Sequence, residues 1–432
     1  MKNLVFFLVF LFCSLRADYK VDEFSLKNGL KVIMIEKKSV PIVDCSIWFS
    51  CGSKCDALFK SGEAHFLEHL ACKNHKRKFM NYLGDIGADW NAFTSANMVC
   101  FYEIFPKECL EKVLSFESER MRSLEIEEKD FQNEKKAILE ERGMRVDSNE
   151  WGKSYEVFLS NVFNRQVGGI DVIGWKHEIE SIEVEDLQDY YRTWIVPNNA
   201  TLILVGDFDK EEAKQLIKKY FEDIPASKLP EKISSSKKTD GKKFIEYKSV
   251  KIESSSIKYT YKIPFLFKNN LRKSTALSLA LEVLEQPLSF VNGILKQMTN
   301  TVSSLWFLYS DSLHEYVDVY FSTNAIDNLD KIDAAWSYFR KRIINGCINE
   351  SDLQKIKRRK LIELAYKKED IEQISNYFGG NLMKGLSVKE ILSLDNLIQS
   401  ITVKECNDVL KEVFSTSSIA VMKILPKGYD RD

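Results

Sequence analysis

The segment at residues 62–70, GEAHFLEHL, contains two histidines and a glutamate at spacings that suit a metal ion. Residues three and four apart share one face of a helix, so His65 and His69 can bind the same ion, and Glu68 faces the same side. The order H-x-x-E-H is the inverse of the H-E-x-x-H zinc motif. With only 5 histidines in 432 residues, an accidental pair at this spacing is disfavoured. We therefore predict a zinc site here, rather than the alternative of a solvated helix face.

A third ligand must come from elsewhere, because a catalytic zinc has three protein ligands and an open fourth position for water. A charged helix predicted over residues 127–146 carries Glu134 and Glu141, which are two turns apart and project in one direction. One of them can bind the metal, and the other can orient a ligand histidine through its spare N–H. The alternative is that both belong to the solvated side of this helix.

The remaining glutamate of the motif, Glu68, has the position of a general base. Zinc lowers the pKa of a bound water toward about 7. Glu68 can accept a proton from that water and later deliver it to a leaving amine. The motif therefore predicts hydrolysis of peptide bonds.

The overall charge gives no sign of a nucleic-acid partner. The 62 basic residues are matched by 63 acidic ones, whereas a protein that binds nucleic acid needs a clustered basic excess. The nine cysteines form no CxxC motif, and neither disulfide pairing nor free buried thiols can be preferred from their spacing.

The N-terminus has the layout of a secretory signal peptide. Lys2 precedes an apolar run at residues 4–12, and a short polar stretch follows. The run is shorter than the roughly 20 residues that span a bilayer, so a membrane anchor is the weaker alternative, as is a lipid on Cys13. We predict a signal peptide over residues 1–17, with no transmembrane span after its removal. The mature chain is then expected in the periplasm of a Gram-negative bacterium or outside the cell.

The periodicity of the chain predicts a duplicated α+β fold. Asn28-Gly29 between alternating apolar residues is typical of a hairpin, residues 109–124 have the spacing of a helix, and residues 200–207 read as a buried strand. Residues 225–243 lack apolar periodicity and predict a linker. The pattern at residues 179–189 recurs at 398–408, a constant offset of 219. We infer two homologous halves, residues 18–224 and 244–432.

The sequence resembles the pitrilysin, insulinase and mitochondrial processing peptidase family of zinc proteases with the inverted motif. The likeness is carried by HFLEH, by NAFTS at residues 91–95, by FQNEKKAILEER from Phe131 and by GWKHEIESI from Gly174. The resemblance implies that Glu141 is the third zinc ligand and Glu134 an outer residue that supports the site. Because the second half contains only His314, one zinc per chain is expected.

The same resemblance implies how substrate binds. Two α/β-roll domains, each a mixed sheet with helices on one face, form a subunit, and two subunits close around a chamber that admits peptides or unfolded polypeptides. The edge strand beside the zinc would hold the substrate through Asn91, Ala92, Phe93 and Thr94, since a peptide can add to such an edge as an extra strand.

The sequence departs from the family in its second half, where active members carry an Arg and a Tyr that hold the substrate carbonyl. Lys296 and Ser303 align with these positions, and neither replaces the lost group, because lysine lacks the guanidinium fork and serine is short. The chain is therefore expected to work as a homodimer, or as a heterodimer with a paralogous subunit that supplies Arg and Tyr. The alternative function is a non-catalytic or partner-dependent subunit of such a peptidase.

Overall fold

The computed structural model describes residues 20–73, 76–163, 169–231, 241–263, 270–286, 302–311, 315–323 and 329–427. The predicted signal peptide, residues 232–240 of the predicted linker and Lys296 lie outside the described residues. Ser303 belongs to a described strand, but its side chain is not among the described ones.

The first half of the chain builds a six-stranded mixed sheet in the order β1-β2-β6-β3-β5-β4. Asn28 and Gly29 form the predicted hairpin turn between the antiparallel strands β1 and β2, and Gly29 has the positive φ of 91° that such a turn requires. The buried strand predicted at residues 200–207 is β6, which is buried along its whole length because it lies inside the sheet. The strands are β1 (Val21–Ser25), β2 (Lys31–Glu36), β3 (Ile42–Phe49), β4 (Asp89–Thr94), β5 (Val99–Pro106) and β6 (Ala200–Gly206).

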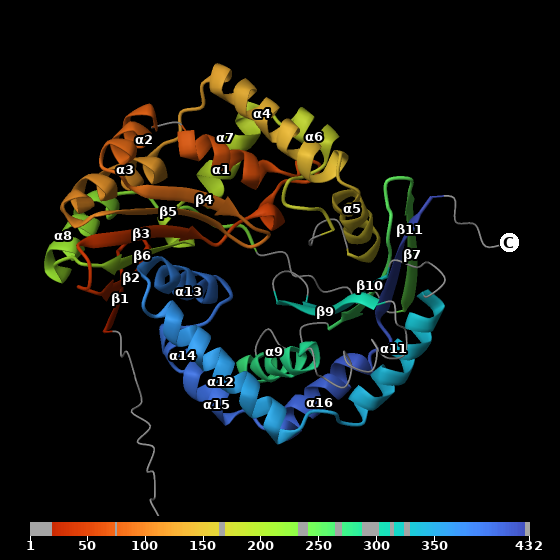
Figure 1. Ribbon diagram of the computed structural model, residues 1–432. Coiled ribbons are helices and arrows are strands. Elements are labelled where there is room, and N and C mark those ends of the chain that lie inside the picture. Colours follow the sequence, from red (N-terminus) through yellow and green to blue (C-terminus); the bar gives the residue numbers. More distant parts are fainter. Residues whose placement is uncertain are drawn as a thin grey trace, which may run out of the picture.

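Helices cover one face of this sheet, and their apolar sides form the first core with it (Figure 1). The helices predicted from residues 109 and 127 are both present. The second ends at Arg142 and continues as the π-helical turn η3 (Gly143–Asp147) instead of α-helix. The helices are α1 (Glu63–Lys73), α2 (Lys76–Asp85), α3 (Leu110–Arg122), α4 (Glu128–Arg142), α5 (Glu150–Val162), α6 (Lys176–Ser181), α7 (Val184–Trp194) and α8 (Lys210–Phe221).

The second half repeats this plan on the other side of the predicted linker. Its five-stranded sheet has the order β7-β11-β8-β10-β9, which matches β2-β6-β3-β5-β4 strand for strand, including the parallel pair at β7 and β11. The predicted duplication is therefore confirmed. The strands are β7 (Lys242–Ser249), β8 (Ser255–Lys262), β9 (Val302–Asp311), β10 (Glu315–Thr323) and β11 (Ile419–Pro426). Strand β7 takes in the last two residues of the predicted linker.

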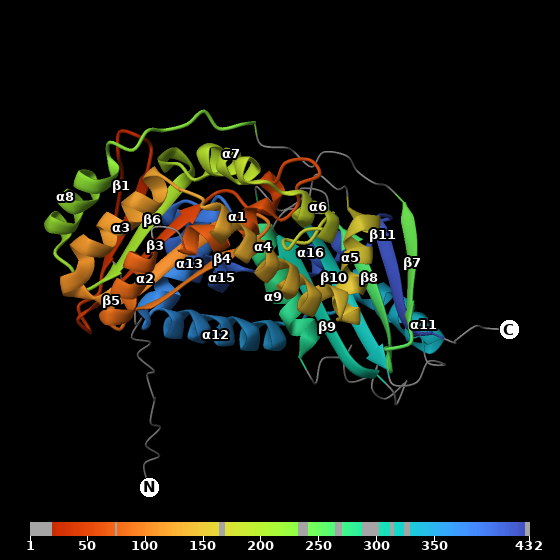
Figure 2. The same cartoon turned by 90° about the horizontal axis from the view of Figure 1, so that it is seen from above.

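In both halves, helices lie between β3 and β4 or their counterparts β8 and β9, and again between β5 and β6 or their counterparts β10 and β11. The first half adds α8 after β6, with no counterpart after β11 in the described part of the second half. Figure 2 shows both sets of helices from above. The helices of the second half share a separate core with the second sheet, formed by buried side chains of both. They are α9 (Leu271–Glu285), α11 (Leu329–Ile344), α12 (Glu350–Lys367), α13 (Ile371–Met383), α14 (Val388–Leu392), α15 (Leu394–Ser400) and α16 (Val403–Phe414).

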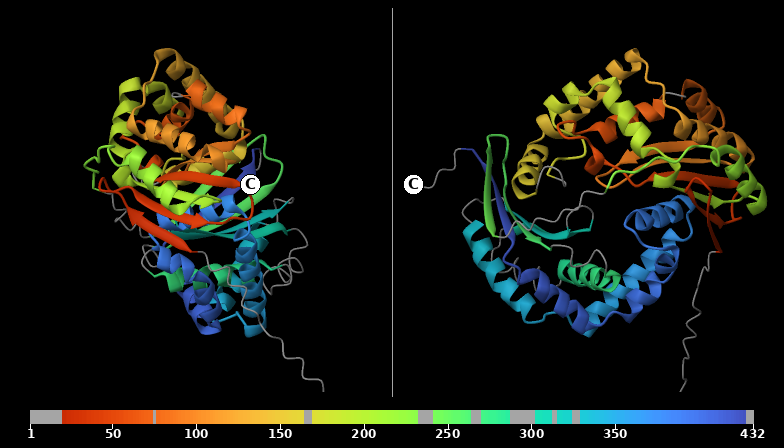
Figure 3. Two further views of the ribbon diagram at one scale, coloured as in Figure 1. Left: turned by 90° about the vertical axis from the view of Figure 1, so that its left-hand side faces the viewer. Right: turned by 180° about the vertical axis from the view of Figure 1, so that it is seen from behind.

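One helix of each half packs on the sheet of the other half. The sequence did not predict this exchange. Figure 1 and Figure 3 show α5 beside β7 and β11, and α13 against the first sheet. Phe158 of α5 is fully buried in a cluster with Met422 of β11. On the other side, the hydroxyls of Ser46 in β3 and Ser375 in α13 lie 2.7 Å apart. Trp48 of β3 and Phe378 of α13 are also buried in one apolar cluster, so two reciprocal contacts join the halves.

Within the described residues, no helix has both the length and the apolar character needed to cross a bilayer. The eight cysteines from Cys45 onward are free thiols.

Candidate metal centre

Helix α1 carries the H-x-x-E-H motif, and its start is fixed by the preceding loop. The carboxylate of Asp56 accepts hydrogen bonds from the backbone N–H of Gly62 at 2.8 Å and of Ala64 at 2.9 Å, so it caps amides that the helix leaves without partners. A methyl group at Gly62 would lie 2.9 Å from the carbonyl oxygen of Ile173. The loop, the helix and the segment around Ile173 therefore have one fixed arrangement.

The apolar face of α1 determines which way the motif points. Phe66, Leu67 and Leu70 are buried in the first core, at positions that alternate with the motif residues along the helix. This leaves His65 and His69 on the face turned toward α4. Their imidazole centroids are 4.7 Å apart.

Helix α4 is held against α1 by its own apolar residues. The ring of Phe131 stacks on that of Phe66 with centroids 5.1 Å apart, and Ile138 is completely buried two turns later. Glu134 and Glu141 follow these residues by three positions each, which turns both carboxylates toward the histidines. Glu134 is only 4% exposed, so the alternative of a solvated helix side is wrong for this residue.

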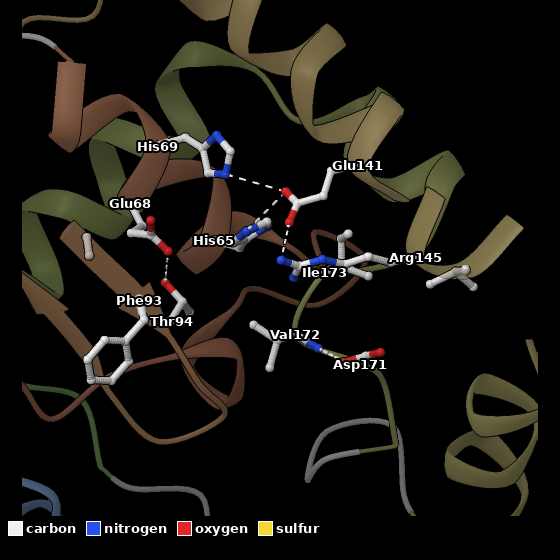
Figure 4. A pocket seen from close by; sticks show the side chains of 12 residues that line it. His65, Glu68, His69, Phe93, Thr94, Glu141, Arg145, Asp171, Val172 and Ile173 are labelled. Atoms are coloured by element: carbon white, nitrogen blue, oxygen red, sulfur yellow. Dashed lines mark hydrogen bonds and ion pairs between the residues drawn. The ribbon is translucent and has the colours of Figure 1, made fainter. Parts of the chain in front are cut away.

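The possible ligand atoms of α1 and α4 face one another across a short distance (Figure 4). One carboxylate oxygen of Glu141, Oε2, lies 3.6 Å from Nε2 of His65 and 3.6 Å from Nε2 of His69. Together these residues offer three ligand atoms within 4.8 Å of one another. The other nitrogen of His69, Nδ1, lies 3.3 Å from Oε2 of Glu134. Glu134 can thus accept the Nδ1 proton, which leaves the Nε2 lone pair of His69 free to bind a metal.

This donor set fits zinc. Two tetrahedral ligands at about 2.0–2.1 Å from the ion lie roughly 3.4 Å apart, close to the observed separations. Burial, with smaller effects from His69 and Arg145, lowers the pKa of His65 to about 3. His65 is therefore neutral at physiological pH and has a lone pair to donate. Two imidazole nitrogens and a carboxylate oxygen that face one another suit a cation, whose charge offsets the repulsion of their lone pairs.

Glu68 lies beside this point and contacts the edge strand β4. Its Oε2 accepts a hydrogen bond of 2.9 Å from the hydroxyl of Thr94. Burial is the largest cause that raises the pKa of Glu68 above its ordinary value. A carboxylate with a raised pKa is better suited to holding a proton temporarily than an exposed one.

Edge strand β4 forms one wall of the cavity that contains the histidines. This strand is the last in the sheet order, so one of its sides is open. Ala92, Phe93 and Thr94 line the cavity, which has a volume of about 300 Å³. Asn91 is not among the lining residues, and its side chain accepts a hydrogen bond from the backbone N–H of Ala92 at 2.8 Å instead.

Five further lining residues were not predicted from the sequence. They come from η3 and from the segment before α6: Arg145, Val146, Asp171, Val172 and Ile173. For Arg145 a signal was present, because it follows Glu141 by one helical turn and can pair with it. For residues 171–173 the sequence carries no such signal, since only the fold brings them to α1.

The fold and the site define a class: two α/β-roll domains, the first of which has an inverted H-x-x-E-H helix, a carboxylate from a second helix and an open edge strand. Two sequence models of one peptidase family match this chain. The model described as insulinase (peptidase family M16) matches residues 31–167, and that of the peptidase M16 inactive domain matches residues 181–360. The chain belongs to peptidase family M16. The region matched by the inactive-domain model contains none of His65, His69 and Glu141.

Relatives of this chain include named zinc proteases. The zinc protease PqqE of Helicobacter pylori is 28% identical over 210 residues, which is 48% of this chain and 47% of that protein. The mitochondrial-processing peptidase subunit beta of Lentinula edodes is 27% identical over 210 residues, 48% of this chain and 45% of that protein. Each match thus covers about half of either sequence.

Solved structures share the complete fold. A protease from Helicobacter pylori has a TM-score of 0.84 and 21% identity, and the superposition covers 94% of this chain and 99% of that chain. The first half of the periplasmic protease PqqL from Escherichia coli has a TM-score of 0.76 and 21% identity, with 94% and 92% of the two chains covered. At these identities the likeness concerns the fold.

Proposed function

We propose that this chain is a zinc-dependent endopeptidase that hydrolyses peptides or unfolded polypeptide segments. The observation that carries the proposal is the meeting of Nε2 of His65, Nε2 of His69 and Oε2 of Glu141, beside Glu68 and an open edge strand. Each of these features has a separate part in peptide hydrolysis.

His65, His69 and Glu141 would hold one zinc ion per chain, with Glu134 orienting His69 through its Nδ1 proton. The ion supplies a Lewis acid that polarises the carbonyl of the scissile bond and makes water more acidic. We find no second set of such ligands among the described residues.

Glu68 would act as the general base and then as the general acid. Its carboxylate accepts a proton from the attacking water while the water oxygen bonds to the carbonyl carbon. When the C–N bond breaks, Glu68 returns that proton to the amine nitrogen, so the carboxylate is regenerated. The hydroxyl of Thr94 holds Oε2 of Glu68 in place.

The substrate would add to β4 as a further strand. The backbone at Asn91, Ala92, Phe93 and Thr94 would supply hydrogen bonds that require an extended peptide but no particular side chains. A folded protein cannot offer such a strand, so peptides and unfolded segments are the expected substrates.

The working assembly would be a dimer. It would be either a homodimer or a heterodimer with a paralogue that supplies Arg and Tyr. In the heterodimer, the activity of this chain would depend on its partner. The relative from Lentinula edodes is, by its name, the beta subunit of a processing peptidase, which supports the heterodimer.

The site of action would be the periplasm of a Gram-negative bacterium, or the medium, after removal of residues 1–17. The charged and apolar layout of the N-terminus supports export. The related PqqL of Escherichia coli is named a periplasmic protease.

The experiment is to purify Glu68→Gln and to measure both bound zinc and hydrolysis of an unstructured peptide. The amide keeps the shape of the side chain but cannot accept the proton, so zinc should be retained while the rate falls by about 100-fold or more. The exposed neighbour of the third ligand offers a control, because Glu140→Gln should change neither property. A rate for Glu68→Gln within a few-fold of the unmodified chain would contradict the assigned base.

A further inference from the structure

Arg145 is the one lysine or arginine among the residues that line the metal cavity in the described part of the chain. It stands on η3, the π-helical turn that follows the third ligand. Such turns are rare and are found at functional sites more often than elsewhere. Three acidic side chains, Glu68, Glu141 and Asp171, line the same cavity.

The side chain of Arg145 contacts the third ligand directly. Its Nη2 donates to Oε1 of Glu141 at 2.7 Å, whereas the other oxygen of Glu141 faces both histidines. The two carboxylate oxygens thus have different partners, as Figure 4 shows. This contact fixes the rotation of the carboxylate group, which determines whether Oε2 points at the metal position.

The backbone that carries Arg145 is held firmly. Val146 is only 2% exposed, and a methyl group at Gly152 of α5 would lie 2.2 Å from the carbonyl oxygen of Arg145. Arg142 anchors the start of the turn through a 2.9 Å ion pair with Glu156. The guanidinium of Arg145 therefore extends from a rigid support.

The rest of the Arg145 guanidinium is open to the cavity. The side chain is 67% exposed, compared with 4% for Arg142. A guanidinium has five N–H donors and stays charged at every physiological pH. The contact with Glu141 uses Nη2 of the Arg145 guanidinium. Its other N–H donors stay within reach of a negatively charged group.

We propose that Arg145 is a positioning residue for Glu141 and also the specificity-determining residue that favours an acidic side chain next to the scissile bond. The first role concerns the metal ligand itself. The second role rests on the proposed function, because it needs a bound peptide. A carboxylate of the peptide would form a charge-assisted hydrogen bond with the free edge of the guanidinium.

The test compares Arg145→Ala, Arg145→Lys and the control Met144→Ala, which changes the exposed neighbour on the same turn. Zinc affinity is measured by competition with a chelator. Hydrolysis is measured on two unstructured peptides that differ only by Glu or Gln beside the cleaved bond, in whichever form of the protein is active. Lysine keeps the charge but loses the fork, so the two variants separate positioning from selectivity.

Arg145→Ala should weaken zinc binding by about 10- to 100-fold, as for other outer residues of metal sites, and should lose the preference for the Glu peptide. Arg145→Lys should keep much of that preference but bind zinc less tightly, and Met144→Ala should change neither. Unaltered zinc affinity in Arg145→Ala overturns the positioning role, and an unaltered Glu-to-Gln ratio overturns the selectivity. An unmodified chain that neither binds zinc nor cleaves peptide overturns the proposed function instead.

Discussion

The two glutamates of α4 contact different atoms of the candidate metal site. Oε2 of Glu141 faces the two ligand nitrogens, whereas Glu134 lies 3.3 Å from the far side of the His69 ring. Glu134 acts through His69 and does not reach the metal position. We therefore propose Glu134 as a positioning residue, although its carboxylate has the same chemistry as that of Glu141.

Removal of Glu134 tests this distinction. Glu134→Ala should retain a zinc site of lower affinity, by about 10- to 100-fold, because the tautomer and the orientation of His69 are no longer fixed. Competition with a chelator measures the effect, with the exposed Glu140→Ala on the same helix as the control. Complete loss of zinc at saturating concentrations would instead place Glu134 among the ligands.

The residues that could be predicted from the sequence are those whose geometry is set within one helix. The spacing of His65, Glu68 and His69 follows from the helical repeat, and so does that of Glu134 and Glu141. Which of the two glutamates faces both histidines could not be decided from spacing. It depends on how α4 lies across α1, which is set by the contact of Phe131 with Phe66.

For the helices and strands, too, only local features could be predicted from the sequence. The hairpin at Asn28-Gly29 and the repeat at an offset of 219 residues were readable, because turn chemistry and amphipathic periods are local. The exchange of α5 and α13 between the halves was not. An apolar helix face indicates that the helix is buried, but it does not indicate which sheet covers it.

The contact of α13 with the first sheet offers a sharp test of that exchange. A methyl group at Gly379 would lie 2.0 Å from Cε2 of the Trp48 ring, whereas one at the adjacent Gly380 would meet nothing within 4 Å. Gly379→Ala should lower the apparent Tm and cost about 1–3 kcal/mol, as overpacking does. Gly380→Ala should leave the Tm unchanged or raise it, because alanine favours helix over glycine by up to about 1 kcal/mol.

Thermal unfolding followed by circular dichroism measures both variants. Equal Tm values for the two alanine variants would show that α13 does not pack on Trp48. Because neither glycine lies at the metal centre, zinc content should be the same in both.

The whole molecule raises the question of a partner. The two halves share one fold, but the candidate ligands His65, His69 and Glu141 all lie in the first half. The second half has Lys296 and Ser303 at the positions where the family resemblance leads us to expect an Arg and a Tyr. A subunit of this kind can act when another chain supplies the missing donors.

We predict that the isolated chain hydrolyses an unstructured peptide slowly, and that a co-expressed paralogue with Arg and Tyr raises the rate. Donors that stabilise the developing oxyanion are each worth roughly 10²- to 10³-fold in rate. The assay compares the chain alone with the co-purified pair, and size-exclusion chromatography gives the subunit composition. Full activity from the isolated chain, unaffected by Lys296→Ala, would remove the need for a partner and leave the zinc chemistry in place.

The most direct measurement is the zinc content of the purified mature chain and of four variants, by mass spectrometry of the metal. We predict about one zinc per chain in the unmodified protein, in Glu68→Gln and in Glu140→Gln, and a large loss in His69→Ala and Glu141→Gln, which each remove a ligand. A full complement of zinc in both ligand variants, or none in the unmodified chain reconstituted with zinc, would contradict the metal centre proposed here.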